Sequence, residues 1–388
     1  MIPYATQTID ETDLAAVRAV LTSGWLTQGP AVPQFEQAFA QVHQVAHACA
    51  VSNATAGLHL ACLALGVGPG DWVWTSPISF VASANCALYC GAQVDFVDID
   101  LVTRNMSVAA LTEKLAQAKR LDKLPKVVIP VHFAGLSCDM AALRALADEY
   151  GFALLADASH AVGAYYQGQP VGSQWADISV FSFHPVKIIT TGEGGMVVTN
   201  DARLAARVVL LRSHGITRDP ALMESQNLVE EPWRYEQQDL GFNYRLTDIQ
   251  AALGSAQLTR LEAFHAQRES LAANYPDLLA NLGLVLPQVP DGYRSSWHLY
   301  AVQVSEQNGK TDRARVFNRL RELDIWVNVH YIPIYLQPHQ RRLGGFGPGY
   351  CPNAETYYRG ALSLPLYPTL RPEQQQEVAH ALRQAIAA

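Results

Sequence analysis

Between about residues 70 and 200, short apolar runs alternate along the chain with stretches of helical pattern. Most of these runs do not alternate apolar with polar residues, which is typical of strands that are buried on both faces. Helical crossovers between successive strands favour parallel pairing. The pattern therefore predicts an α/β fold with a mostly parallel sheet between two layers of helices, with strands at 72–74, 93–97, 127–131, 152–156, 178–181 and 196–199.

The pattern changes after about residue 250. A long helical stretch at 248–274 leads to a second unit that mixes strands and helices. At 388 residues the chain is long enough for two or three domains. We therefore expect an N-terminal segment and large α/β domain over 1–250, and a linking helix and small α+β domain over 251–388. Outside the large sheet we expect helices at 10–21, 314–323 and 372–386, and strands at 299–304 and 326–330.

The charge balance and the chain start narrow the classes of partner. Lys plus Arg is 28 and Asp plus Glu is 35, so the net charge is −7. This mild acidity argues against a nucleic-acid partner and against an anionic membrane surface. Since no apolar run approaches ~20 residues and residues 1–6 do not resemble a signal peptide, we expect a cytoplasmic protein.

The cysteines and histidines do not predict a metal site. The six cysteines form no C-x-x-C pair and are interpreted as reduced core residues. His43 and His47 have a spacing seen in metal sites, but they lack the intervening carboxylate of H-E-x-x-H and a nearby third ligand. We therefore predict no metal.

Three features lie where an open α/β sheet binds its ligands, beyond the carboxyl ends of the strands. Asp157 directly follows one predicted strand; it suits a helix cap, a metal ligand or the partner of a cationic ring nitrogen. Lys187 follows the next strand among apolar and small residues. It is either a nucleophilic amine with a lowered pKa or a lysine that extends to solvent. Residues 52–57 open a helix with small residues, and they suit either a phosphate or an ordinary cap.

Together these features favour one cofactor. The chain has no G-x-x-x-x-G-K-[ST] loop and no G-x-G-x-x-G after its first strand, so ATP and NAD lose their main support. A lysine amine, a carboxylate and a phosphate-binding helix start are what pyridoxal 5′-phosphate (PLP) requires. The residues therefore point to a PLP enzyme.

At this level of detail the chain resembles the DegT/DnrJ/EryC1/StrS sugar-nucleotide aminotransferases, a branch of the fold-type I PLP enzymes with a seven-stranded type of sheet. The resemblance runs from about Tyr4 to the C-terminal helix. Within the family it is most similar to the pseudaminic-acid pathway enzymes, which aminate C4 of a UDP-4-keto-6-deoxy-N-acetyl-L-altrosamine-type sugar. The stretches that carry the resemblance are 26–29, 76–82, 159–163, 180–187, 190–195, 212–215, 241–246 and 329–335.

The resemblance implies a role for each matched residue. Lys187 binds the cofactor covalently and moves protons, while Asp157 keeps the ring nitrogen protonated. Phe80 stacks on the ring and His160 lies near the ring hydroxyl. Phosphate contacts come from Ala54, Thr55 and Ser182, and from Asn243 of a partner subunit. Candidates for the substrate pocket are Tyr4, His184, Tyr244, His330 and Tyr331.

The implied reaction is a ping-pong transamination with L-glutamate as donor, carried out by a homodimer with shared active sites. A family variant that dehydrates at C3 replaces the lysine by histidine, so Lys187 favours transamination. Two other classes stay open: a PLP-binding regulator without turnover, and an NAD-type α/β oxidoreductase. A purified protein that is yellow and changes colour with glutamate would distinguish the aminotransferase from both.

Overall fold

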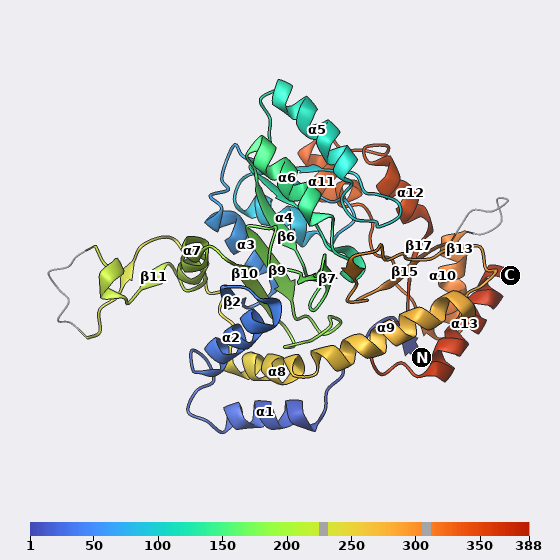
Figure 1. Cartoon of the computed structure of the whole chain (residues 1–388), viewed down its shortest axis with the longest axis horizontal. Coiled ribbons are helices and arrows are strands. Elements are labelled where there is room, and N and C mark those ends of the chain that lie inside the picture. The colour runs from blue at the N-terminus through green and yellow to red at the C-terminus, as the bar shows by residue number, and fades with distance from the viewer. Residues whose placement is uncertain (225–231, 305–311, 388) are drawn as a thin grey trace.

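The computed structural model of the chain describes residues 1–224, 232–304 and 312–387. A seven-stranded sheet lies at its centre (Figure 1). Neighbours from β4 to β9 are parallel, and β10 is antiparallel to both of its neighbours. The α/β prediction is thus confirmed. The strand order is β2 (His47–Val51), β10 (Gly195–Thr199), β9 (Ile178–Ser182), β6 (Ala153–Asp157), β5 (Val127–Ile129), β3 (Trp72–Thr75) and β4 (Gln93–Phe96).

Helices cover both faces of this sheet, because successive strand residues pack to opposite sides. Val127 packs in one core and its neighbour Val128 in another. The first core includes α3 (Ala54–Ala64), α4 (Ala82–Tyr89) and α7 (Ala202–Arg212). The opposite face is covered by α2 (Ala31–His43), α5 (Val108–Arg120), α6 (Met140–Tyr150) and α8 (Asp248–Leu258).

Strand β2 is absent from the sequence predictions. Its sequence, HACAV, ends in one β-branched residue and is otherwise small or polar, so it lacks the apolar run of the other strands. Pairing with β10 over five residues defines it instead.

His43, at the end of α2, is a buried packing residue. Its ring stacks on Phe39, and its Nδ1 lies 2.8 Å from the Val171 carbonyl.

A second core lies around a three-stranded antiparallel sheet, as expected for an α+β unit. Helix α9 (Leu261–Leu278) begins against the large-sheet core at Leu261 and Phe264 and continues into the second core at Leu271 and Tyr275. The N-terminal strand β1 (Ile2–Pro3) joins this unit by pairing with β16 (Ile325–Trp326). Its other main elements are β13 (Leu284–Val285), β15 (Tyr300–Val304), β17 (Ala361–Leu364), α10 (Arg313–Glu322) and α13 (Pro372–Ala387).

The remaining elements are short. They are β7 (Tyr165–Tyr166), β8 (Gln169–Pro170), β14 (Tyr293–Arg294), β11 (Ile216–Thr217), β12 (Glu236–Gln237), α11 (Pro338–Leu343), α12 (Pro352–Gly360) and the 3₁₀ turns 133–135, 220–222 and 334–336. The β11–β12 pair forms an arm that projects from the body of the molecule (Figure 1).

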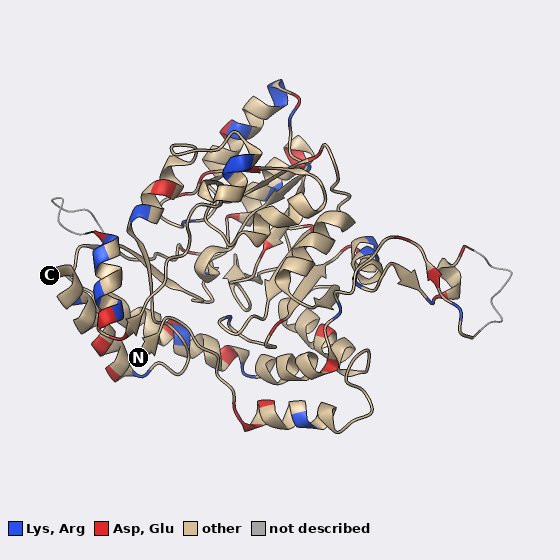
Figure 2. Cartoon of the chain, turned by 180° about the vertical axis from the view of Figure 1, so that it is seen from behind, with Lys and Arg blue, Asp and Glu red and all other residues tan. Residues whose placement is uncertain are grey.

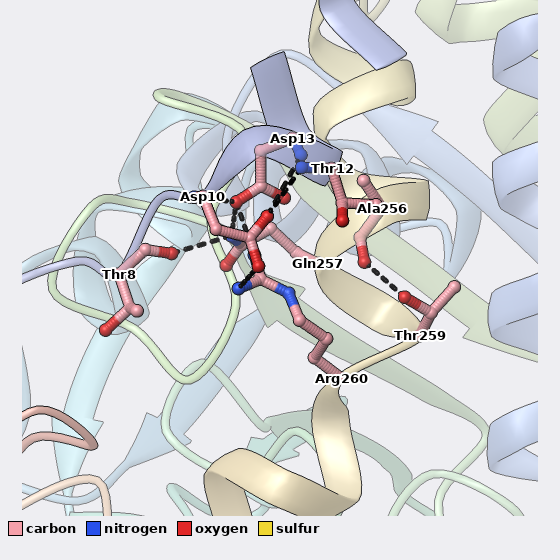
Figure 3. A network of polar contacts seen from close by, with 8 residues as sticks. All are labelled: Thr8, Asp10, Thr12, Asp13, Ala256, Gln257, Thr259 and Arg260. Carbon is pink, nitrogen blue, oxygen red and sulfur yellow. Dashed lines mark hydrogen bonds and ion pairs between the residues drawn. The ribbon is translucent and has the colours of Figure 1, made fainter. Parts of the chain in front are cut away.

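The single helix predicted over 248–274 is wrong, because the structure has two helices. Helix α8 ends at Leu258 and α9 begins at Leu261. At the junction the Thr259 hydroxyl donates to the Ala256 carbonyl, and such back-bonding competes with the helical ladder. Arg260 then turns its guanidinium toward carboxylates of the N-terminal helix (Figure 3).

That helix, α1 (Glu11–Leu21), starts at Asp10 as expected, with a capping box formed by Asp10 and Asp13. Asp13 is buried, with 1% of its surface exposed. Its carboxylate accepts from the Arg260 guanidinium and from Gln257 Nε2 at 2.8 Å. These contacts attach α1 to the end of α8 through Gln257 and to the α8–α9 junction through the ion pairs of Arg260 (Figure 3).

Arg260→Met is expected to lower the free energy of unfolding by about 3 kcal/mol, because it leaves the buried Asp13 carboxylate without its cation. Urea denaturation measures the loss. Arg18→Met is the matched control, since Arg18 is an exposed arginine on α1. Equal denaturation midpoints for the two variants would contradict this account of the network.

Charged residues lie mostly on peripheral helices and loops, while the central strands carry few of them (Figure 2). Asp157 is therefore an exception in the sheet. Among the described residues, no helix combines the length and the apolar character that crossing a bilayer requires.

Candidate active site

A cavity of about 690 Å³ lies at one edge of the large sheet. Gly195, the first residue of β10, pairs with Ser182 at the end of β9 and with Val51 at the end of β2. The parallel strand β6 ends at Asp157 beside them. The cavity is lined by Tyr4, Asn53, Ala54, Thr55, Leu58, Ser79, Phe80, Ala82, Val131, Asp157, Ser159, His160, Ser182, His184, Val186, Lys187, Glu193, Asn328, His330 and Tyr331.

The start of α3 presents free backbone donors to this cavity. The Asn53 side chain caps the helix by accepting from Ala56 N at 2.8 Å. Among the described residues, the N–H groups of Ala54 and Thr55 have no hydrogen-bond partner. A Cβ on Gly195 would lie 2.8 Å from Ala54 N, so glycine allows β10 to approach the helix start closely. The two N–H groups suit an anion.

Asp157 is buried, with 5% of its surface exposed. Its Oδ1 accepts from Ser159 N at 3.1 Å and its Oδ2 from Ser83 Oγ at 2.6 Å. Residues 158–164 form turns, so Asp157 does not cap a helix. The carboxylate is held in place and lines the cavity, where it suits a cationic partner.

Lys187 lies in the loop after β9 and also lines the cavity. Burial lowers the pKa of its amine to about 8, although the attraction of Asp157 opposes this shift. A larger fraction of the amine is therefore neutral near physiological pH than in a solvated lysine. The side chain has the properties of a nucleophile rather than those of a solvated surface lysine.

His160 adopts a defined tautomer beside these groups. Its Nδ1 accepts from Ala134 N at 3.2 Å, which places the ring proton on Nε2, 3.3 Å from the Tyr331 hydroxyl. Burial, together with the charge of Lys187, holds the pKa of His160 well below its usual value. His160 therefore acts as a neutral hydrogen-bonding group.

Phe80 is 60% exposed at the cavity wall, so it is not a core aromatic. An exposed ring at a cavity is available for stacking on a planar ligand.

The structure also brings Tyr4, His184, His330 and Tyr331 to this cavity. His330 Nδ1 lies 2.8 Å from Ser363 Oγ of β17, so the second unit supplies part of the wall.

Two predicted site residues do not line this cavity. Tyr244 stacks on Phe242 and places its hydroxyl 3.4 Å from His59 Nδ1, which removes it from the cavity wall. Asn243 is exposed and bridges to Ser213. An exposed position is compatible with a contact to another chain.

Several lining residues are absent from the sequence predictions, among them Ser79, Ser159 and Asn328. Ser79 and Ser159 stand beside Phe80 and Asp157, so proximity in sequence was an available signal. Asn328 follows β16 in the second unit, and the local sequence contains no comparable signal.

The donor set fits PLP. The free N–H groups at the start of α3 and the Ser182 hydroxyl suit its phosphate, Asp157 suits its ring nitrogen and Lys187 suits its aldehyde. No group of His, Cys, Asp and Glu among the described residues is arranged to hold a metal ion.

Comparison with known proteins agrees with this geometry. The sequence profile of the DegT/DnrJ/EryC1/StrS aminotransferase family matches residues 7–383. The chain is 38% identical to the spore coat polysaccharide biosynthesis protein SpsC of Bacillus subtilis (strain 168), over 99% of this chain and 97% of that protein.

Among solved structures, Helicobacter pylori PseC, an aminotransferase involved in the biosynthesis of pseudoaminic acid, superposes with a TM-score of 0.89 at 33% identity. The match covers 100% of this chain and 99% of that chain. The PLP form of the Streptococcus pneumoniae putative sugar aminotransferase Spr1654 superposes with a TM-score of 0.87 at 28% identity, over 100% and 98%.

Proposed function

This chain belongs to the DegT/DnrJ/EryC1/StrS aminotransferase family, and we propose that it aminates the C4 ketone of a UDP-4-keto-6-deoxy-N-acetyl-L-altrosamine-type sugar with L-glutamate as donor. It is a PLP-dependent sugar aminotransferase with the fold-type I architecture. Beyond this family-level function, the proposal specifies the sugar substrate and the amino donor. It also specifies a role in pseudaminic acid or related surface-glycan biosynthesis and a cytoplasmic location.

One observation carries the PLP chemistry on which the proposal rests: an amine, a carboxylate and two free backbone N–H groups meet in one cavity. Lys187, Asp157 and the start of α3 lie far apart in the sequence, yet all line the same volume. A covalent amine site, a cation partner and an anion site are what a PLP enzyme needs.

The chain's own residues then perform distinct tasks. When bound, PLP supplies the electron sink that makes the donor's α-proton acidic. Lys187 Nζ accepts that proton and later returns a proton at the sugar's C4. Asp157 would keep the ring nitrogen cationic, and Phe80 would provide an aromatic surface for the ring. Ala54 and Thr55 anchor the phosphate through their N–H groups.

The cavity also suits a sugar nucleotide in size and chemistry. Its volume exceeds what the cofactor's ring alone would occupy. Tyr4, His184, His330 and Tyr331 offer hydroxyl and imidazole groups for sugar and phosphate oxygens. The pseudaminic assignment draws on the likeness to PseC across the whole chain.

A second candidate is another UDP- or dTDP-4-keto-6-deoxy sugar for a surface polysaccharide. The 38% identity to SpsC, whose name refers to spore coat polysaccharide, favours this alternative. A PLP-binding regulator without turnover is the weaker alternative, because the lysine and the aspartate both face the cavity.

Incubation with a panel of UDP- and dTDP-linked 4-keto sugars, followed by mass spectrometry, tests the assignment. We expect the UDP-linked L-altro ketone to have the highest kcat/KM. A D-xylo or dTDP-linked ketone that is aminated at least about tenfold better would contradict it, since tenfold corresponds to about 1.4 kcal/mol of transition-state binding. That result would leave the family membership unchanged.

We also propose a homodimer in which Asn243 reaches the partner's phosphate site. Asn243 is exposed and does not line its own chain's cavity. The projecting β11–β12 arm and its neighbouring loops carry exposed apolar side chains that a second copy would cover: Leu222, Trp233, Tyr235 and Leu240. A symmetric dimer would then contain two shared sites.

Mixing Lys187→Ala chains with Asn243→Ala chains tests the shared site. With random exchange, about half of the dimers are mixed, and each mixed dimer has one intact site. We expect recovery toward about a quarter of wild-type activity if Asn243→Ala alone is strongly impaired. Proven exchange without recovery above the two parents would show that Asn243 does not act across the interface.

A further inference from the structure

The Asp157 carboxylate receives a hydrogen bond from a serine that the active-site cavity does not reach. Ser83, in the first turn of α4, is fully buried, and its Oγ lies 2.6 Å from Asp157 Oδ2. A second serine lies behind it, because Ser79 Oγ is 2.6 Å from Ser83 Oγ. Ser79 is 4% exposed and lines the cavity. The three side chains form a continuous chain of hydrogen bonds.

The direction of these hydrogen bonds follows from the donor inventory. An ionised carboxylate can only accept, so the single Ser83 proton points to Asp157. Ser83 then has only lone pairs for Ser79, so Ser79 donates to it. The competing acceptor for Ser83, the Phe80 carbonyl, is more distant at 3.4 Å. Both hydroxyl dipoles therefore stabilise a negative Asp157.

We propose that Ser83, supported by Ser79, is a positioning residue that fixes the Asp157 carboxylate in the rotamer that faces the cavity and stabilises its negative charge. The proposal rests on the proposed role of Asp157 toward the cofactor's ring nitrogen. A hydrogen bond to a charged acceptor is stronger than one between neutral groups. Ser83 therefore contributes to the reaction from a position outside the cavity lining.

Other groups also act on Asp157. Lys187, in the loop after β9, is the nearby cationic group, and the charge of Asp157 raises its pKa. Asp157 in turn helps to raise the pKa of Tyr331. His160, three residues beyond Asp157, is neutral because its pKa is lowered. The serines are thus two neutral donors within a set that includes one cation, so their effect is separable by substitution.

The test compares Ser83→Ala, Ser79→Ala, Ser83→Thr and Asp157→Asn in the protein loaded with PLP. The readouts are the dissociation constant of PLP and the pH titration of its visible absorption. The matched control is Ser173→Ala, which removes another buried serine whose hydroxyl donates to a backbone carbonyl outside the cavity, that of Pro170 at 2.7 Å. Thermal denaturation checks that each variant folds.

In Ser83→Ala we expect the midpoint of this absorption titration, which reports protonation of the lysine–PLP linkage nitrogen, to rise by about half a pH unit or more. A loosened Asp157 carboxylate holds the ring proton less firmly, and a ring that loses its positive charge no longer lowers the proton affinity of that linkage. Turnover falls about tenfold, which corresponds to about 1.4 kcal/mol. Asp157→Asn shifts the midpoint further in the same direction. Ser83→Thr keeps a hydroxyl, so its midpoint lies close to the wild-type value. Ser79→Ala leaves Ser83 in place and therefore shifts the midpoint less than Ser83→Ala does.

Two results would overturn the proposal, and they are distinguishable. If Asp157→Asn moves the midpoint while Ser83→Ala and Ser79→Ala match Ser173→Ala, the serines have only a structural role and the function of Asp157 stands. If Asp157→Asn itself leaves the midpoint unchanged, the role of Asp157 is wrong and the serine proposal is overturned with it. Should Ser83→Ala fail to fold, Ser79→Ala decides between the same results.

Discussion

Lys187→Ala is expected to reduce turnover by about 10⁴-fold or more, because the same amine is both the covalent site and the base for the donor's α-proton. The lowered pKa of Lys187, about 8, fits this double role. PLP binding should survive, since the phosphate contacts at the start of α3 remain. Equilibrium dialysis with PLP and a glutamate half-reaction measure the two properties separately.

The control for this variant is Lys126→Ala, a partly exposed lysine paired with Asp71 at 2.9 Å outside the cavity. It should retain wild-type turnover. Turnover of Lys187→Ala close to that of Lys126→Ala would contradict the mechanism.

Asp157→Asn is expected to lower kcat by about 10²–10⁴-fold, because the amide keeps the shape of the carboxylate but loses the charge that retains the ring proton. PLP should still bind, although more weakly. Steady-state kinetics with glutamate, together with the PLP dissociation constant, measures both effects.

Asp201→Asn serves as the comparison, because Asp201 caps α7 through Arg203 N and Leu204 N and does not line the cavity. Both substitutions remove one carboxylate charge. If kcat falls equally in the two variants, Asp157 contributes no more than a structural aspartate does.

The large sheet was predictable because its strands carry their signal locally. The run 127–131 is apolar throughout and 178–181 has one polar residue, Ser179, and the structure buries both runs on both faces. Strand β2 lacked that signal, since its pairing with β10 depends on residues about 150 positions away. The break between α8 and α9 was missed for a similar reason: Arg260 contacts carboxylates near the N-terminus.

The site was predictable in part. That Asp157 and Lys187 line one cavity was predictable, because strand ends converge at one edge of an α/β sheet. Tyr244, a predicted substrate-pocket candidate, does not line the cavity, because it stacks on Phe242 and approaches His59. The sequence alone does not indicate this stacking. The Ser79–Ser83 chain was also missed, because its link to Asp157 joins residues 74 positions apart.

The most direct test of the account is the covalent labelling of the loaded protein. Sodium borohydride reduces a lysine–PLP linkage to a stable secondary amine, and peptide mapping then locates the pyridoxyl group. The account predicts one labelled peptide, containing Lys187, and loss of that label in Lys187→Ala. A label on a different lysine, or an unlabelled wild-type protein that has bound PLP, would contradict it.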